Sequence, residues 1–201
     1  MTRFDERRAD PDPVRQFQKW FKVALKAGLK EPNAMTLATA TRKGKPSARM
    51  VLLKGVDPRG FVFFSNYESR KGSELRENPR AALVFYWAAL DRQVRVTGRV
   101  SPVTPEESDA YFGTRALGSR FSAAVSKQSS VVKSRAALEA DLAKLKARYP
   151  EAGPPRPKYW GGYRVDPDEI EFWQQGEFRL HDRLRYRKRG DGTWRIDRLA
   201  P

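Results

Sequence analysis

Short apolar segments separated by turn signals are the feature that most restricts the fold of this chain. In the segment at 92–103, Val94, Val96 and Val100 alternate with polar residues, which places them on one face of an extended strand. Asp57-Pro58-Arg59-Gly60 is a strong turn signal between two such segments. The pattern predicts further strands at 34–41, 47–56, 61–66, 81–90, 169–174, 183–189 and 193–199. Many short strands favour an antiparallel barrel over a Rossmann fold, for which βαβ alternation and GxGxxG are missing.

Helical spacing is confined to a few segments, so the helices are expected to lie outside the barrel. Asp12-Pro13 can cap and open one helix, and Thr104-Pro105-Glu106-Glu107 is a capping box for another. The expected helices are 13–27, 70–78, 104–112, 119–125 and 134–149. The expected fold class is α+β and mainly β, with peripheral helices. Residues 13–201 are expected to form a single domain, and residues 1–12 a flexible N-terminal arm.

Charge and composition restrict the partners. The chain has 40 Lys and Arg against 24 Asp and Glu, a net charge of +16 at pH 7, which attracts polyanions and phosphorylated small molecules. The basic residues are spread along the chain without a zinc-finger, basic-zipper or RNP-type motif, so nucleic acid is an unlikely partner. There is no cysteine and no metal-ligand cluster, so no metal site is predicted. Without a signal sequence or an apolar membrane span, a cytoplasmic protein is expected.

A helix start near residue 70 carries two cations where cations are normally unfavourable. Ser69 is a good N-terminal cap, and Arg70 and Lys71 follow it in the first turn. The helix dipole already places positive charge there, so the two cations make most sense if an anion binds. The alternative, two solvated charges, has about equal weight on this segment alone.

Two further segments have cations at suggestive positions. Arg49 and Lys54 flank an apolar strand and, five residues apart, should point to opposite faces. Tyr111, Arg115 and Ser119 recur every four residues and would form a phosphate cup if the helix that starts at 104 continued. A buried strand with charged ends and a solvated helix edge are the simpler explanations of the two patterns taken alone.

The segment at 172–183 is the most unusual part of the chain. It contains the only histidine, His181, between Arg179 and Arg183, and an extended chain would aim all three side chains one way. A neutral imidazole beside guanidinium groups suits an anionic or heteroaromatic ligand, which favours a functional role over a structural one. The chain has no nucleophile–base triad, so a cofactor is expected to supply any difficult chemistry. The polar turn at 127–130 has the composition of an ordinary loop.

These segments, in this order, resemble the pyridoxamine 5′-phosphate oxidase family. The matching pieces are RMVLLK at 49–54, FVFFSNYESRK at 61–71, RQV at 92–94, VSKQSS at 125–130, YWGG at 159–162, EFWQ at 171–174 with RLHDR at 179–183, and WRIDRLAP at 194–201. Each piece is weak alone, but the ordered set is highly specific and covers nearly everything from about residue 34 onward.

The resemblance implies a homodimer with the split β-barrel fold and FMN at the subunit interface. The residues that it assigns to FMN in one subunit are Arg49, Met50, Val51, Leu52, Lys54, Phe64, Ser65, Arg70, Lys71 and Gln93. Those that it assigns to the partner are Gln128, Ser129, Trp173 and Arg183. The implied substrate site consists of Lys54, Tyr111, Arg115 and Ser119 around the phosphate, and of Arg179, Leu180 and His181 at the ring.

The implied reaction is the oxidation of pyridoxamine or pyridoxine 5′-phosphate to pyridoxal 5′-phosphate, within vitamin B6 biosynthesis or salvage. O2 is the electron acceptor, H2O2 is released, and the amine substrate also yields ammonia. Arg179 is expected to steer the substrate and stabilise developing charge, with His181 supporting that pose. Both are the candidate catalytic residues.

Two departures from the family pattern affect these expectations. Phe64 stands where the family often has tyrosine, and the N-terminal segment has no clear match to the Arg-Arg-x-Tyr segment of longer members. The alternatives are a related FMN oxidase of phenazine biosynthesis, a flavin-binding protein without catalysis, and a basic nucleic-acid-binding module. Intact Arg179-Leu180-His181 favours the vitamin B6 substrate over the first two.

Overall fold

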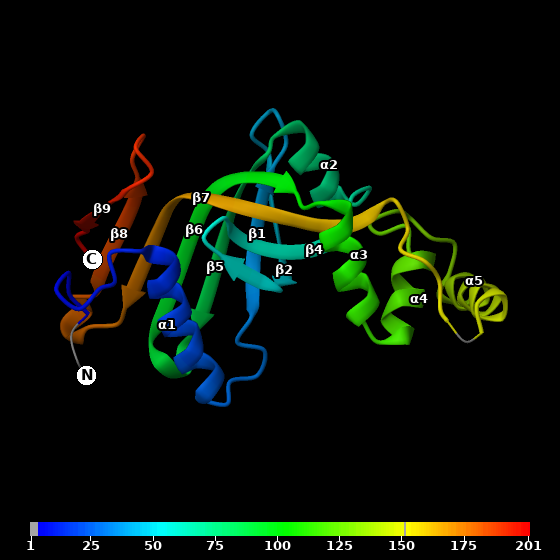
Figure 1. Cartoon of the computed structure of the whole chain (residues 1–201), viewed down its shortest axis with the longest axis horizontal. Coiled ribbons are helices and arrows are strands. Elements are labelled where there is room, and N and C mark those ends of the chain that lie inside the picture. The colour runs from blue at the N-terminus through cyan, green and yellow to red at the C-terminus, as the bar shows by residue number, and fades with distance from the viewer. Residues whose placement is uncertain (1–3, 151) are drawn as a thin grey trace.

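The computed structural model describes residues 4–150 and 152–201. Its centre is one curled, nine-stranded antiparallel sheet in the order β2-β1-β5-β6-β7-β4-β3, with β8 paired to β7 and β9 paired to β8 (Figure 1). The strands are β1 (Ala34–Ala40), β2 (Pro46–Leu52), β3 (Gly55–Asp57), β4 (Gly60–Asn66), β5 (Arg80–Trp87), β6 (Arg92–Pro102), β7 (Trp160–Gln174), β8 (Asp182–Lys188) and β9 (Trp194–Arg198). The prediction of a mainly β fold with peripheral helices is confirmed.

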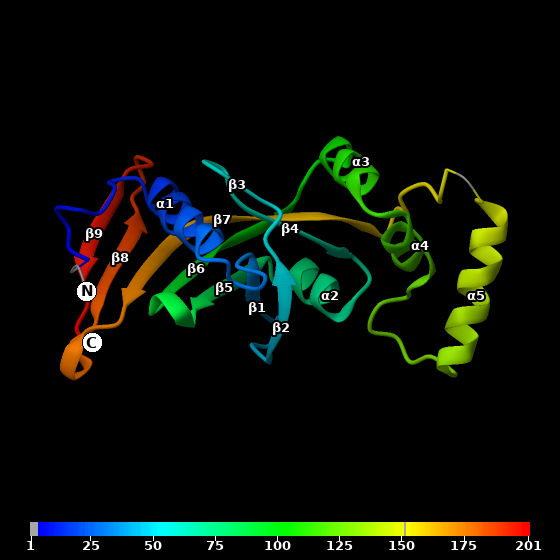
Figure 2. The same ribbon diagram turned by 90° about the horizontal axis from the view of Figure 1, so that it is seen from below.

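In the part of the chain that the structure describes, five α-helices and two 3-10 turns accompany the sheet. They are α1 (Pro13–Lys26), α2 (Arg70–Glu77), α3 (Pro105–Thr114), α4 (Leu117–Val125), α5 (Arg135–Arg148), η1 (Ala88–Leu90) and η2 (Glu177–Arg179). Figures 1 and 2 show an elongated molecule in which α1 lies beside β5–β7, α2 near the middle, and α4 and α5 at the end remote from β8 and β9. No helix of the described residues is long and apolar enough to cross a membrane.

The core forms where the inner face of the sheet meets α1. Asp12 caps this helix by accepting hydrogen bonds from the backbone N–H groups of Val14 and Arg15, as the sequence predicts. Phe17 is fully buried and its ring lies 4.9 Å from those of both Phe61 and Phe85. Burial of these large rings is the main source of stability here, because the free energy gained grows with the apolar area removed from water.

The segment predicted to be an arm packs against this core over its described part. Phe4 is buried, its ring lies 4.9 Å from that of Trp20, and its N–H donates to Asp182 Oδ2 at 3.0 Å. The Tyr186 hydroxyl donates to the carbonyl of Asp10 at 2.8 Å. Residues 4–12 thus link α1 to β8, while the division between arm and domain stays a prediction.

β7 is much longer than the predicted strand at 169–174, because its first half contains residues typical of turns. Gly161 and Gly162 pair with β4, and Pro167 pairs with Gly98 at a bulge in the β6–β7 register. A bulge removes the requirement for a regular ladder hydrogen bond, so proline is tolerated there. This long strand joins the two halves of the sheet.

The predicted strand at 47–56 is divided in two. β2 ends at Leu52, and β3 begins at Gly55. Between them the backbone N–H of Leu53 donates to the carbonyl of Asn33, and that of Lys54 donates to the carbonyl of Val62. The chain therefore passes from a pairing with β1 to a position beside β4, which a strand pattern alone does not reveal.

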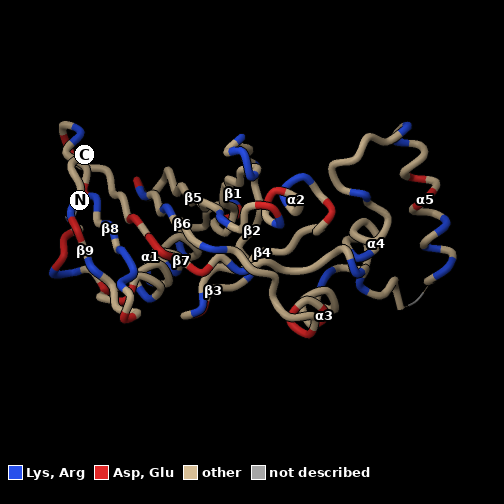
Figure 3. Tube along the Cα trace, turned by 90° about the horizontal axis from the view of Figure 1, so that it is seen from above, with Lys and Arg blue, Asp and Glu red and all other residues tan. Residues whose placement is uncertain are grey.

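The positive charge is distributed over the whole molecule. Figure 3 shows Lys and Arg on β8 and β9, in the turn between β1 and β2, near α2 and on α5. Many of them are paired: Arg164, for example, contacts both Asp57 and Glu107 at 2.9 Å. The basic residues are therefore spread along the length of the molecule.

Candidate active site

A cavity of about 820 Å³ lies between β2, β4, the start of α2 and the α3–α4 region. The predicted residues that line it are Arg49, Met50, Val51, Leu52, Lys54, Phe64, Ser65, Arg70, Lys71, Tyr111, Arg115, Ser119, Gln128 and Ser129. Ser47, Ala48 and Ala116 also line it, although no sequence pattern indicated them, as does Trp160 of the YWGG motif, to which no role had been assigned. Residues that are far apart in the sequence thus meet around one space.

Arg49 and Lys54 contribute to the same cavity, which contradicts the expectation that they point to opposite faces. That expectation assumed a regular strand from 49 to 54. The strand ends at Leu52, and the change of direction before β3 brings Lys54 back to the side of Arg49. The two cations at the ends of this apolar segment therefore line one cavity.

The start of α2 supplies a second group of cations. Ser69 caps the helix, as predicted, by accepting a hydrogen bond from the N–H of Gly72. Lys71 is buried, and its Nζ donates to Gln128 Oε1 at 2.8 Å and to Ser65 Oγ at 3.1 Å. Burial, aided by repulsion from Arg49, lowers the pKa of Lys71 to about 8. An anion bound here would offset that cost.

Gln128 and Ser129 line the cavity together with Arg70 and Lys71 of their own chain. The family resemblance assigned both residues to the partner subunit, but Gln128 contacts Lys71 within one chain. The polar turn at 127–130 is therefore a wall of the cavity. Ser129 has a φ of 74°, a left-handed conformation that is unusual for a residue with a side chain.

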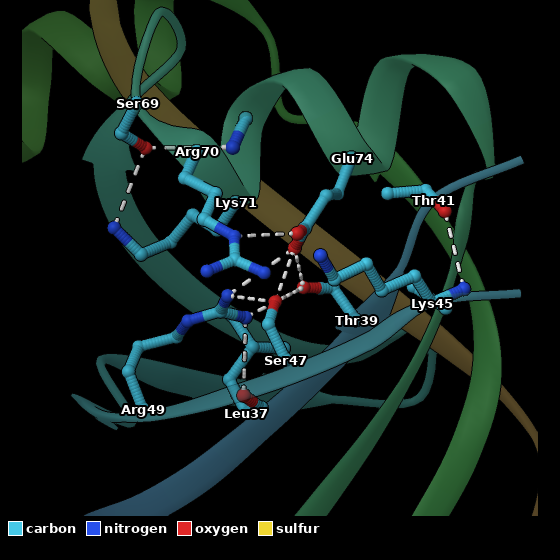
Figure 4. A network of polar contacts seen from close by, with 12 residues as sticks. Leu37, Thr39, Thr41, Lys45, Ser47, Arg49, Ser69, Arg70, Lys71 and Glu74 are labelled. Carbon is cyan, nitrogen blue, oxygen red and sulfur yellow. Dashed lines mark hydrogen bonds and ion pairs between the residues drawn. The ribbon is translucent and has the colours of Figure 1, made fainter. Parts of the chain in front are cut away.

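A buried carboxylate, missed by the sequence analysis, contacts two of the arginines (Figure 4). Glu74 lies 3.2 Å from Arg49 and 2.9 Å from Arg70. Burial alone would raise its pKa, but hydrogen bonds from Ser47, Thr39, Arg70 and Arg49 outweigh burial and lower the pKa to about 2. Glu74 is therefore ionised throughout the neutral range. Only its helical spacing from Arg70 could have indicated the contact.

The α3–α4 side of the cavity differs from the continuous helix that was considered. α3 ends at Thr114, and α4 begins at Leu117 after an extended Arg115. Tyr111, Arg115 and Ser119 nevertheless line the same cavity. The NH1 atom of Arg115 is buried and has no hydrogen-bond partner among the described residues. A buried guanidinium nitrogen without an acceptor is costly unless a ligand supplies one.

Three parallel rings form one wall. The Phe64 and Tyr111 rings stack at 3.9 Å, and the Trp160 ring lies 5.5 Å from Phe64 on a nearly parallel plane. The Arg115 guanidinium lies 4.6 Å from the Trp160 ring and Lys54 Nζ 5.9 Å from the Tyr111 ring. The wall therefore combines flat apolar surfaces with cations, which suits a phosphorylated aromatic molecule.

The segment around the histidine lines a different cavity, of about 880 Å³. Leu180 and His181 contribute to it, and the His181 ring lies 4.7 Å from that of Trp173. His181 Nδ1 accepts a hydrogen bond from the Gly176 N–H at 3.2 Å, which leaves Nε2 as the nitrogen that carries the proton in the neutral ring.

The segment is not extended, so the common direction that an extended chain would give Arg179, His181 and Arg183 does not apply. Phe178 and Arg179 have φ values of 53° and 63°. The 3-10 turn η2 therefore interrupts the regular alternation that would point Arg179, His181 and Arg183 in one direction. Left-handed conformations of such residues are strained and tend to occur at functional sites. Arg179 is exposed, whereas Arg183 pairs with buried Glu171 at 2.8 Å.

Gln93 does not line the first cavity, contrary to its assignment beside Arg49 and Lys71. It pairs across strands with Trp173, which in turn pairs with Arg183. Directly paired residues share a face of the sheet, so the three form one row across β6, β7 and β8. Gln93 therefore belongs with the histidine segment.

The two groups of site residues do not meet within one chain. The two cavities have no lining residue in common. The histidine segment lies at the end of the molecule with β8 and β9, whereas α2, α3 and α4 lie in the middle and toward the opposite end (Figures 1 and 2). One ligand can contact both groups only if a second chain supplies one of them.

Comparison with known proteins identifies the family. The family model described as "Pyridoxamine 5'-phosphate oxidase" matches residues 21–149. The model described as "Pyridoxine 5'-phosphate oxidase C-terminal dimerisation region" matches residues 160–201. The chain belongs to the pyridoxamine 5′-phosphate oxidase family. The resemblance inferred from the ordered motifs is thereby confirmed, and the chain is a member of an oxidoreductase family.

Similar members of this oxidase family are known from several bacteria. A protein of Paraburkholderia phymatum named "Pyridoxine/pyridoxamine 5'-phosphate oxidase" is 60% identical over 96% of this chain and 90% of its own length. One of the same name from Rubrobacter xylanophilus is 59% identical over 96% of this chain and 88% of its own length.

Solved structures confirm the fold of the oxidase. PhzG from Burkholderia lata, in complex with tetrahydrophenazine-1-carboxylic acid, is 34% identical and covers 100% of this chain and 98% of its own, with a TM-score of 0.94. A pyridoxamine 5′-phosphate oxidase-related, FMN-binding protein from Nostoc punctiforme shares the fold at 17% identity, with coverages of 94% and 98% and a TM-score of 0.75.

Proposed function

We propose that the chain is an FMN-dependent oxidase that converts pyridoxamine or pyridoxine 5′-phosphate to pyridoxal 5′-phosphate, with O2 as acceptor. H2O2 is released, together with ammonia from the amine. The observation that carries this proposal is that one cavity has two groups of cations around a flat aromatic wall. Arg70 and Lys71 form one group, and Lys54 and Arg115 form the other. Two phosphorylated rings require such a pair of groups.

The residues of the cavity fit FMN. Arg70 and Lys71 stand at a capped helix start, where a phosphate meets free N–H groups and a favourable dipole. Met50, Val51 and Leu52 offer an apolar strand edge along which the flavin ring can lie. Bound FMN would supply the two-electron oxidation and its reoxidation by O2. Family membership, together with an FMN-binding protein of the same fold, supports this cofactor.

The protein orients the substrate. Lys54, Tyr111, Arg115 and Ser119 would bind the substrate phosphate, and the unpaired Arg115 NH1 would donate to it. His181, fixed through Nδ1 by the Gly176 N–H, would present its Nε2 proton to the pyridine ring or its hydroxyl group. Arg179 would cover the ring and stabilise the charge that develops during the reaction. Leu180 would contribute apolar contact beside them.

The active unit would be a homodimer with FMN at the interface. The match of residues 160–201 to a dimerisation model supports this assembly. Large apolar side chains that line both cavities are exposed in the single chain: Met50 of the first cavity is 61% exposed, and Leu180 and Phe178 of the second are 69% and 91% exposed. Such exposure is expected of surfaces that a second copy covers. Gln93, Trp173 and Arg183 would then reach the flavin from the partner side.

A phenazine-type oxidase is the second candidate, because PhzG has nearly the same backbone. The relatives that act by name on pyridoxine and pyridoxamine phosphate are about 60% identical, against 34% for PhzG. The vitamin B6 substrate is therefore favoured. A cytoplasmic location stays a prediction.

A visible spectrum of the purified protein tests the function. FMN-loaded protein should be yellow and should bleach when pyridoxamine 5′-phosphate is added without oxygen. Admission of air should restore the colour and release H2O2. A yellow protein that stays oxidised with pyridoxamine phosphate, but bleaches with a reduced phenazine precursor, would support the second candidate instead.

A further inference from the structure

Glu74 occupies the centre of a polar network that joins α2 to β1 and β2 (Figure 4). Only 4% of the residue is exposed. Its Oε2 accepts hydrogen bonds from Thr39 Oγ1 and Ser47 Oγ at 2.5 Å each, and lies 3.2 Å from Arg49 NH2. Its Oε1 accepts a hydrogen bond from Arg70 Nε at 2.9 Å. Both carboxylate oxygens are therefore engaged by side chains from three elements.

The two arginines in this network differ in how many of their nitrogens are hydrogen-bonded within the protein. Arg49 uses both terminal nitrogens within the protein: NH1 donates to the Leu37 carbonyl and Thr39 Oγ1, and NH2 donates to Ser47 Oγ and Glu74. Arg70 is held only through Nε, and its side chain is 57% exposed. Among the described residues, nothing accepts from its two terminal nitrogens. Arg70 thus presents the planar fork that suits a phosphate group.

The charges in this part of the cavity also match a phosphate. Arg49, Arg70 and Lys71 provide three positive charges and Glu74 provides one negative charge, which gives a net charge of +2. This charge is equal and opposite to that of a phosphate dianion. Without Glu74 the group would attract anions more strongly through charge alone. Its presence therefore needs a reason other than attraction.

We propose that Glu74 is a positioning residue of the phosphate site: it anchors Arg49 and holds Arg70 by Nε, so that the terminal fork of Arg70 faces the flavin phosphate. This inference rests on the proposed function. A long arginine side chain loses rotamer freedom when it binds, and Glu74 removes much of that freedom in advance. The contribution of Glu74 is therefore specific to ligands that carry the phosphate.

The test compares FMN with riboflavin, which has the same ring without the phosphate. The dissociation constants of both for the apoprotein of Glu74→Gln are measured by quenching of flavin fluorescence. FMN affinity should fall by about tenfold, while riboflavin affinity should change by less than about twofold. A charge effect alone would tighten FMN binding, so tighter binding, or an unchanged ratio of the two constants, would overturn the proposal.

Two further variants separate positioning from a general loss of structure. Glu77→Gln, on the exposed side of the same helix, should leave the FMN-to-riboflavin ratio at the wild-type value. Ser47→Ala removes one donor to Glu74 and should shift the ratio in the same direction by a smaller factor, which keeps the test open if Glu74→Gln does not fold. In an Arg70→Ala background, Glu74→Gln should have a reduced effect on the ratio.

Binding of FMN by the wild type separates the proposed function from the role of Glu74. If the wild-type apoprotein does not bind FMN, the proposed function fails. If the wild type binds FMN more tightly than riboflavin, but Glu74→Gln and Ser47→Ala keep the wild-type ratio, the proposed function stands and the role of Glu74 is refuted.

Discussion

Lys71 combines burial with a position in the cavity wall, and both affect its charge. Among the described residues, its ammonium group has only neutral acceptors, Gln128, Ser65 and Ser69, within hydrogen-bond distance. Burial therefore lowers its pKa from an ordinary value of 10.5 to about 8. Above pH 8 much of the apoprotein has a neutral Lys71, whereas a bound phosphate favours the protonated form. FMN binding and proton binding are thus coupled at this residue.

FMN affinity should consequently fall as the pH rises through about 8. The sign follows from the lowered pKa: below it the site is already protonated, and above it binding must take up a proton. The decrease in affinity can approach about tenfold per pH unit in this range. Titration of the apoprotein with FMN at several pH values measures it. Riboflavin, or Lys71→Met protein, should show no such step. A pH-independent FMN affinity across pH 8 in the wild type would refute this coupling.

At the scale of elements, the long strand β7 positions the aromatic wall. Its residue Gly162 lies beneath Phe64, and a Cβ atom there would be 2.8 Å from the Phe64 ring and 2.6 Å from Val103 Cγ2. Both distances are shorter than normal carbon contacts, so any larger residue must displace the ring. Phe64 stacks on Tyr111, so the displacement would reach the proposed substrate site.

Gly162→Ala should therefore raise the KM for the phosphorylated substrate and lower stability by about 1–3 kcal/mol through overpacking. Steady-state kinetics and thermal unfolding measure the two effects. Gly113→Ala is the matched control, because nothing lies within 4 Å of its Cβ position and the residue is in a helix. That control should be neutral or slightly stabilising. Equal effects of the two substitutions would contradict the packing argument.

Local sequence patterns predicted most elements, but they did not predict where the elements change direction. Alternation and capping located β6 and α3 because both signals lie within a few residues. The first half of β7 was missed, since Gly161-Gly162 and Pro167 are typical of turns and become a strand only through pairing with β4 and β6. The shared cavity of Arg49 and Lys54 likewise depends on a strand break that only the neighbouring strand explains.

The site was predicted mainly through the ordered motifs, and less by single residues. The histidine segment favoured a ligand-binding role before any family was considered, whereas the helix start at Ser69 gave phosphate binding and solvated charges about equal weight. Glu74 and the role of Trp160 were missed because each depends on partners distant in the sequence, Arg49 for one and Phe64 for the other. The contact between Gln128 and Lys71 of the same chain was missed for the same reason, and the subunit from which Gln128 reaches FMN stays a prediction.

At the scale of the whole molecule, the separation of the two cavities is the main consequence of the fold. The sheet is long enough to place the cation-rich cavity and the histidine segment apart (Figure 1). In a symmetric dimer, the same surface of each chain meets its counterpart, so two complete sites can form from two incomplete ones. Each site would then take the cavity from one chain and Arg179 and His181 from the other.

A heterodimer of two defective chains tests this account most directly. Arg115→Ala damages the cavity, and Arg179→Ala damages the segment beside the histidine, so each homodimer should have little activity at low substrate. If the two variants are co-expressed with different tags and purified through both, one of the two sites is free of substitutions, and about half of the wild-type activity should return. A heterodimer no more active than the two parent homodimers would contradict a site shared between chains.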